Sequence, residues 1–287
     1  MAEGNEESLI RGNMHSVSPR ALPIEVNRSI VQRAAEREPD PASIIVNYIA
    51  EQPFQAYYRR KPVASPSHGW GARLEAYFWP AQDGNWSRTC NRVSAISCQI
   101  RRAIDKLQAC VDDAAAAAEL LVAFKCTCAW GSVKLPESDS DRLAKEVLPA
   151  VRALSSGREP PSGSRLNSAW TKLYAFALRY TCVIYDSRVA TALTSILDPA
   201  MHSISTPPRW QPYSCLGTIS GRGGSRPRDI SWKWPKGYGK WAAQMAASLL
   251  CRKVVDELNT RTDCRKRDDR SPWTLREVEA VLFMEGY

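Results

Sequence analysis

The chain has 287 residues, of which 44% are hydrophobic and 24% are charged, which is the composition of an ordinary globular protein. Lysine and arginine outnumber aspartate and glutamate by 39 to 30, and the formal net charge of +9 favours a polyanionic partner such as nucleic acid. No apolar run approaches the roughly 18 residues of a membrane span, and the acidic stretch at residues 2–7 is unlike a secretory leader. We therefore expect a cytoplasmic protein that does not bind a membrane.

Cysteine and histidine spacing bears on metals and disulfides. The nine cysteines are an odd number and most fall within predicted helices, so buried free thiols are expected rather than a disulfide framework. His15, His68 and His202 lie far apart, and Cys126 and Cys128 have no second pair nearby. Because zinc sites need closely spaced sets of such ligands, we expect no metal and no cofactor.

The N-terminal part of the chain changes character twice. Residues 1–22 are polar and aperiodic, which predicts a flexible tail. Apolar positions in residues 24–50 fit one or two short helices broken at Pro39 and Pro41. Prolines, glycines and aromatic residues crowd together in residues 52–86, which makes this the place where β-structure is expected.

Three helices are predicted next. Residues 91–111 fit an amphipathic helix because their apolar positions recur every three or four residues. An alanine-rich helix should begin at Ala114 and end at Trp130-Gly131, where glycine takes its usual C-terminal place. A third should run from Asp139 or Ser140 to Leu154 and bend at its internal proline.

Two short apolar helices follow a loop at residues 155–167. Lys172 stands near the start of the first helix and Asp186 at the start of the second. Residues 203–239 are rich in proline, glycine, serine, arginine and tryptophan and form a long insertion, which is expected to be either functional or disordered.

Two helices should close the chain, at residues 241–258 and 271–283, with Ser271 as cap and Pro272 in the first helical position of the second. The pattern gives about eight helices and little sheet. We predict a mainly α fold in which residues 23–287 form a single domain.

Lys172 and Asp186 are the two groups that could break an N-glycosidic bond. Cleavage passes through a sugar with oxocarbenium character, which a carboxylate such as Asp186 can stabilise while it orients the nucleophile. A neutral lysine such as Lys172 can itself attack the sugar and form a Schiff base. The joint placement matters, because we expect the starts of these two consecutive helices to lie on the same side.

Simpler explanations exist for each residue. Asp186 before Ser187 and Arg188 is what an ordinary helix N-cap looks like, and a single lysine near a helix start is usually a solvated surface group. Capping and catalysis are compatible, because a capping aspartate is held rigidly.

These positions resemble the helix-hairpin-helix DNA glycosylase superfamily, in particular its bacterial branch with the 8-oxoguanine glycosylase fold. Lys172 and the Tyr-Asp-Ser-Arg-Val segment at 185–189 match the superfamily's lysine and aspartate in order and type. Trp-Gly-Ser-Val at 130–133 and Leu-Phe-Met-Glu-Gly at 282–286 are similar to two further segments of that branch. The resemblance covers residues 90–287 and implies a helical glycosylase-like fold.

The hairpin differs from that of the family. Arg-Leu-Asn-Ser-Ala-Trp-Thr at 165–171 stands where a glycine-rich turn would grip a phosphate through backbone amides. Arg165, Asn167 and Ser168 are candidates to replace that turn in part, and Trp170 is a further candidate for contact with DNA or the base. The connection between lysine and aspartate is also shorter than in the repair enzymes.

Further DNA contacts are expected from the insertion and from the start of the helix after Asp186. Basic and aromatic residues alternate there, as suits phosphate contacts and base stacking. The candidates are Arg188, Arg222, Arg226, Arg228, Trp232, Lys233 and Trp234. Alternatively, the tryptophans pin the insertion to the helical body, Arg188 pairs with Asp186, and residues 222–226 are disordered without DNA.

By this resemblance, the function to be tested is that of a monomeric DNA glycosylase that flips a modified base out of double-stranded DNA and excises it, leaving an abasic site. Glucosylated 5-hydroxymethylcytosine, a bulky phage base removed in antiviral defence, is the leading substrate. The alternatives are an 8-oxoguanine-type repair glycosylase and lyase, and a non-catalytic DNA-binding module on the same fold. A helical scaffold without a nucleic-acid role would leave the basic, tryptophan-rich insertion unexplained.

Overall fold

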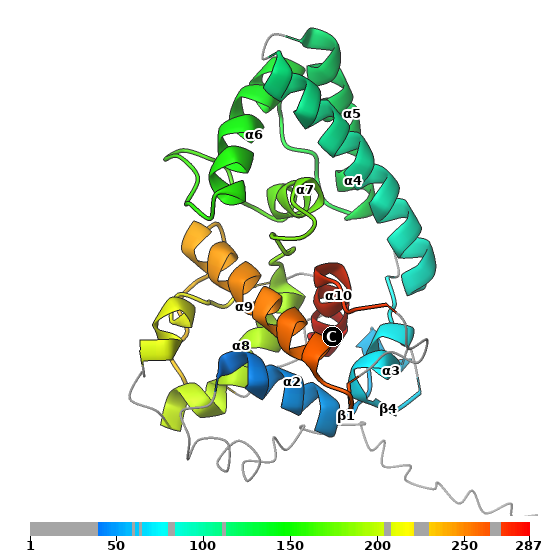
Figure 1. The fold of residues 1–287 in the computed structure, drawn as a ribbon, viewed down its shortest axis with the longest axis vertical. Coiled ribbons are helices and arrows are strands. Elements are labelled where there is room, and N and C mark those ends of the chain that lie inside the picture. Colours follow the sequence, from blue (N-terminus) through cyan, green and yellow to red (C-terminus); the bar gives the residue numbers. More distant parts are fainter. Residues whose placement is uncertain are drawn as a thin grey trace, which may run out of the picture.

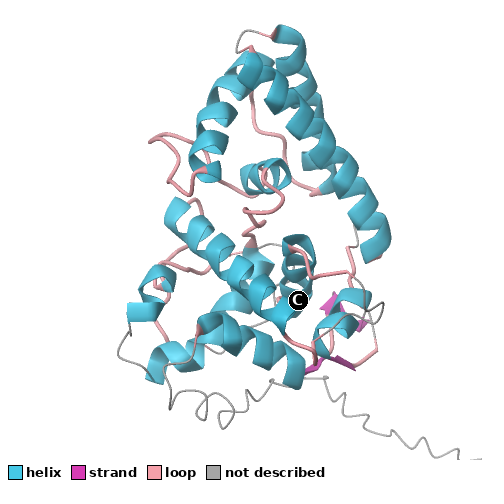
Figure 2. Cartoon of the chain, in the orientation of Figure 1, coloured by secondary structure: helices cyan, strands magenta, loops and turns pink. Residues whose placement is uncertain are grey.

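The computed structural model describes residues 40–58, 61–62, 65–79, 84–110, 113–203, 208–220, 230–264 and 271–287. Within these residues the fold is mainly helical and its strands have two residues each (Figure 2), which confirms the predicted fold class. The predicted tail at residues 1–22 lies outside the described residues. None of the described helices is long and apolar enough to cross a membrane.

The helices form two groups, each with a hydrophobic core of its own (Figure 1). The upper group in the figure comprises α4 (Trp86–Ala109), α5 (Ala114–Trp130), α6 (Ser140–Ser155) and α7 (Trp170–Ala177). The lower group comprises α2 (Pro41–Glu51), α3 (Gly69–Glu75), α8 (Ser187–Ser203), α9 (Trp241–Thr260) and α10 (Leu275–Glu285). The connection from α7 to α8 joins the two groups.

The helices of the upper group begin at side-chain caps. Asn85, Asp113 and Asp139 accept hydrogen bonds from backbone amides in the first turns of α4, α5 and α6, respectively. Such caps satisfy amides that have no partner within the helix. The three predicted helices are therefore confirmed, and α4 starts five residues before the predicted position 91 because its cap is Asn85.

The β-structure lies where it was expected, between α2 and α4. The strands are β1 (Pro53–Phe54), β2 (Tyr57–Tyr58), β3 (Lys61–Pro62) and β4 (Ser67–His68). Two antiparallel pairs result, β1 with β4 and β2 with β3. The sequence analysis missed α3, which follows β4 directly.

The predicted start of the last helix is wrong. Helix α10 is capped by Thr274, whose hydroxyl accepts from the Glu277 amide while the Glu277 carboxylate accepts from the Thr274 amide. This reciprocal pair satisfies two amides at once, so it outcompetes the Ser271-Pro272 start. Ser271 and Pro272 are exposed and precede the helix.

The described part of the insertion at 203–239 packs against the lower group. Buried Asp198 on α8 accepts hydrogen bonds from the amides of Ser231 at 2.7 Å and Trp232 at 2.9 Å and from Trp234 Nε1 at 2.8 Å. A parallel bridge joins Thr218 to Lys236. Residues 204–207 and 221–229 lie outside the described residues, so the predicted contacts of Arg222, Arg226 and Arg228 do too.

Candidate active site between the two helix groups

Lys172 is buried in the first turns of α7. Its side chain is 5% exposed, and Nζ donates to the carbonyl oxygen of Ser168 at 3.1 Å. The start of α7 is fixed by Asn167, whose side-chain oxygen accepts from the amides of Ala169 at 2.9 Å and Trp170 at 3.2 Å. The side chain is therefore not the solvated surface group that is usual for a lysine near a helix start.

Asp186 caps helix α8. One carboxylate oxygen accepts from the amides of Arg188 at 3.0 Å and Val189 at 3.2 Å. The ordinary capping explanation is thus correct for this residue, and it does not exclude a second role, because the cap holds the half-buried carboxylate in a fixed position.

The segment that carries Asp186 is fixed by side chains from three helices. The Val183 carbonyl accepts from Gln244 Nε2 of α9 at 2.7 Å, and the Tyr185 amide donates to Thr171 Oγ1 of α7 at 3.0 Å. Between them, the Ile184 amide donates to the carboxylate of Glu279 on α10. These three hydrogen bonds hold a segment that has no strand partners, which limits its movement.

Lys172 and Asp186 line the same two spaces. One is a small cavity of about 40 Å³ and the other is a cleft of about 1140 Å³, and Trp79 lines both of them as well. The small cavity has room for a water molecule or two but not for a nucleobase, whereas the cleft is larger than a usual small-ligand pocket. Any sizeable ligand must therefore enter from the cleft.

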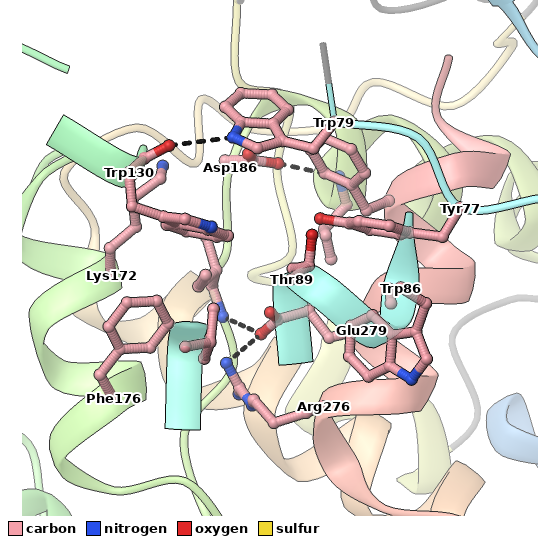
Figure 3. Close-up of a pocket in the computed structure, with 15 residues that line it drawn as sticks. Tyr77, Trp79, Trp86, Thr89, Trp130, Lys172, Phe176, Asp186, Arg276 and Glu279 are labelled. Atoms are coloured by element: carbon pink, nitrogen blue, oxygen red, sulfur yellow. Dashed lines mark hydrogen bonds and ion pairs between the residues drawn. The ribbon is translucent and has the colours of Figure 1, made fainter. Parts of the chain in front are cut away.

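The small cavity has a largely aromatic wall (Figure 3). Its rings are those of Tyr77, Trp79, Trp86, Trp130, Phe176 and Phe283. The Trp79 ring lies at one side of the cavity, and its Nε1 donates to the Trp130 carbonyl at 2.9 Å. The polar residues of the lining are Thr89, Lys172, Asp186, Arg276 and Glu279.

Burial controls the ionisation of this site. It lowers the pKa of Lys172, while the negative charges of Asp186 and Glu279 oppose that change. Burial also raises the pKa of Glu279 to about 7, against the opposing effects of Arg276 and of the hydrogen bond from the Ile184 amide. Both changes favour the neutral forms, as expected for charged groups with little access to water.

Glu279 is one of the site residues that were not predicted from the sequence. The carboxylate accepts from the Ile184 amide and lies 2.7 Å from Arg276 Nη1. The only sequence signal for it was an acidic residue beside Val278 and Ala280, on the helix face that packs into the core. That signal is weak without knowledge of what the face packs against.

Arg188 lies in an aromatic environment beside the site. Its guanidinium carbon is 4.3 Å from the ring centroid of Tyr287, 4.8 Å from that of Phe283 and 5.6 Å from that of Trp79. The backbone of Arg188 also approaches Gly286 so closely that a Cβ atom there would clash with the Arg188 carbonyl. Close packing against Arg188 thus explains why residue 286 is a glycine.

The remaining predicted DNA contacts separate into two sets. Asn167, Ser168 and Arg188 line the cleft. Trp170 does not, since its ring is 0% exposed and packs on Phe124 within the upper core, so the prediction that it contacts DNA is wrong for this structure.

The tryptophans of the insertion agree with the alternative prediction, in which they attach the insertion to the helical part of the protein. Trp232 and Trp234 bind Asp198 away from the cleft. Lys233 is exposed between them and does not line the cleft either. The insertion instead contributes Lys236 and Tyr238 to the cleft wall, and both belong to its alternating basic and aromatic residues.

All nine cysteines are free, as expected, but only Cys128, Cys182, Cys251 and Cys264 are buried. Within the described part of the chain, no group of three or more histidine, cysteine, aspartate or glutamate side chains could hold a metal ion. Comparison with known proteins found no matching family model, no matching curated protein and no matching solved structure. The geometry of the site is therefore what bears on its function.

Proposed function

We propose that this protein is a DNA glycosylase that excises a modified base from double-stranded DNA and leaves an abasic site. The observation that carries the proposal is that a buried lysine and a capping aspartate, from the starts of consecutive helices, line one cleft of about 1140 Å³. A non-catalytic module on this fold predicts that Lys172 and Asp186 share no cavity, and they share two.

Asp186 has the position required to stabilise the transition state. When the bond from C1′ to the base breaks, positive charge develops on the sugar, and a fixed carboxylate at the cleft wall lowers the energy of that charge. The amides of Arg188 and Val189 hold one carboxylate oxygen. The second oxygen can then face the sugar or orient a nucleophile.

Lys172 has the character required of an amine nucleophile. Attack on C1′ needs a neutral amine, and burial lowers the lysine pKa in that direction. The amine would form a bond to C1′ as the bond to the base breaks, and loss of its proton and opening of the sugar would give a Schiff base. If water attacks instead, Lys172 lines the pocket and the excision proceeds without a covalent intermediate.

The charge of the cleft suits DNA. Among the described residues, Lys134, Arg188 and Lys236 line it as cations, and Asp186 supplies the one carboxylate. The N-termini of α7 and α8 meet the same cleft through Ser168 and Ser187, and helix N-termini favour negative charge. These features together favour a phosphate backbone along the cleft.

The size of the cleft supports a bulky base. Glucosylated 5-hydroxymethylcytosine in phage DNA is the leading substrate that we propose, and the protein would act on it in the cytoplasm as a monomer in antiviral defence. The family resemblance suggests this substrate, and a cleft larger than a usual small-ligand pocket has room for the added sugar. An 8-oxoguanine-type repair activity is the alternative and would use the same two residues.

The decisive experiment is a panel of duplexes that carry oxidised, alkylated or glucosylated bases, assayed for abasic sites by alkali cleavage. We expect one class to be excised, and excision of none, with DNA binding retained, would contradict the proposal. Borohydride then tests the nucleophile: a covalent adduct that is lost in Lys172→Ala and kept in Lys145→Ala, an exposed lysine on α6, indicates amine attack.

A further inference from the structure

Glu279 is a buried carboxyl that the proposed chemistry does not use. It stands on α10, far along the chain from Lys172 and Asp186, yet the three side chains line the same small cavity. Figure 3 shows the Glu279 carboxyl on the side of the cavity opposite Asp186, with dashed lines to the Ile184 amide and to Arg276. Burying a carboxyl is costly, so its position needs a reason.

Glu279 acts on Asp186 through the backbone. One carboxylate oxygen accepts from the Ile184 amide and also lies 2.7 Å from Arg276 Nη1. Ile184 precedes Asp186 by two residues, in the extended segment that enters the cleft. The pair of Glu279 and Arg276 thus fixes this segment from the side opposite Thr171, which holds the Tyr185 amide.

Glu279 also faces the charges of the site. The charged and titratable side chains around it are Arg276 on its own helix, Lys172 on α7, Asp186 before α8, Cys251 on α9, Cys182 in the connection and Tyr77 after α3. Its negative charge raises the pKa of Lys172, against the lowering by burial. Glu279 therefore influences both proposed catalytic residues without being at the cleft.

We propose that Glu279 is a positioning residue of this site: its carboxylate sets the place of Asp186 through the Ile184 amide, and its charge acts on Lys172 across the cavity that both residues line. The inference deepens the proposed glycosylase function and rests on it. The cost of losing such support for a site residue is about 10- to 100-fold in activity.

Helix α10 provides a matched control. Glu285 is also buried and pairs with an arginine, Arg73, at 3.1 Å, but it does not line the cavity. We expect Glu279→Ala and Glu285→Ala to lower the melting temperature by similar amounts. Only Glu279→Ala should lower the single-turnover excision rate, by about tenfold or more, with the Kd for DNA unchanged. Equal rates for the two folded variants would overturn the positioning role.

A second measurement needs no DNA. Reductive methylation with formaldehyde and borohydride, followed by mass spectrometry of the peptide that contains Lys172, reports how much of this amine is neutral at each pH. In Glu279→Gln the midpoint should move to lower pH, and in Glu285→Gln it should stay in place. An unmoved midpoint in Glu279→Gln overturns the inference even if the wild type excises a base. If the wild type excises no base, the proposed function is contradicted, and the methylation midpoint still tests whether Glu279 acts on Lys172.

Discussion

Gly131 lies directly against the side chain of Lys172. A Cβ atom at Gly131 would come within 2.6 Å of Lys172 Cδ and 2.7 Å of Lys172 Cε. The bare backbone of the Trp130-Gly131-Ser132 turn is thus what leaves space for the lysine to extend across it. The turn also places Ser132 in the left-handed region, with φ of 48°.

The Gly131→Ala substitution should displace the lysine rather than unfold the protein. The added methyl group meets the flexible end of Lys172, so we expect a small change in melting temperature and a loss of borohydride trapping of about tenfold or more, since misplaced reacting groups lose rate steeply. Gly71→Ala is the control, because no atom lies within 4 Å of a Cβ at that helical position. Full trapping by Gly131→Ala would show that the lysine position does not matter.

The Asp186→Asn substitution should separate capping from chemistry. Asparagine caps helices about as well as aspartate, so the free energy of unfolding should change by less than about 1 kcal/mol, while excision is abolished because the negative charge is lost. Asp139→Asn, at the exposed cap of α6, is the matched control. Thermal unfolding and abasic-site assays measure the two effects, and retained excision in Asp186→Asn would leave capping as its role.

Glu279 should make stability depend on pH. Burial raises its pKa from 4.5 to about 7, so between these values the folded protein holds a proton that the unfolded chain has lost. The free energy of unfolding should therefore gain a component that falls as pH rises through this window. Urea unfolding of wild type and Glu279→Gln should show that component only in the wild type. Glu285→Gln, which retains Glu279, should keep it, and parallel curves for all three proteins would contradict the prediction.

The two exposed cleft lysines should bind DNA through its charge. Lys134 and Lys236 are exposed and line the cleft. If each contacts one phosphate, substitution by alanine should weaken binding to all duplexes alike and reduce the slope of log affinity against log salt by about one. Lys125→Ala, at an exposed position of α5 outside the cleft lining, is the control. An unchanged slope for both cleft variants would place the DNA elsewhere.

Tyr238 should contact the DNA bases. It is 57% exposed, lines the cleft and lies between Gly237, which packs on Gly217, and the start of α9. An exposed ring on a loop that is fixed by such packing can stack on a base, and this stacking contributes about 1–3 kcal/mol to the free energy of binding. We expect Tyr238→Ala to weaken DNA binding about tenfold or more and Tyr238→Phe to retain it. Tyr180→Ala, at a 65% exposed site outside the cleft lining, should bind as the wild type does.

The sequence by itself determined most of the helices and the positions of Lys172 and Asp186 at the starts of consecutive helices. Periodic apolar residues, capping side chains and the glycine at position 131 are local signals, and a helix forms largely from interactions between residues three or four positions apart. These signals predicted α4, α5 and α6 closely, and they placed the lysine and the aspartate at the starts of α7 and α8.

Only the tertiary structure decided what each side chain faces. Trp170 and Tyr238 are both aromatic residues near helix starts, yet the first is buried in the upper core and the second is exposed at the cleft. Glu279 joins the site because α10 packs against α8, a contact between segments about ninety residues apart in the chain. Burial and long-range contact set the protonation of Lys172 and Glu279, and neither quantity is encoded in local sequence spacing.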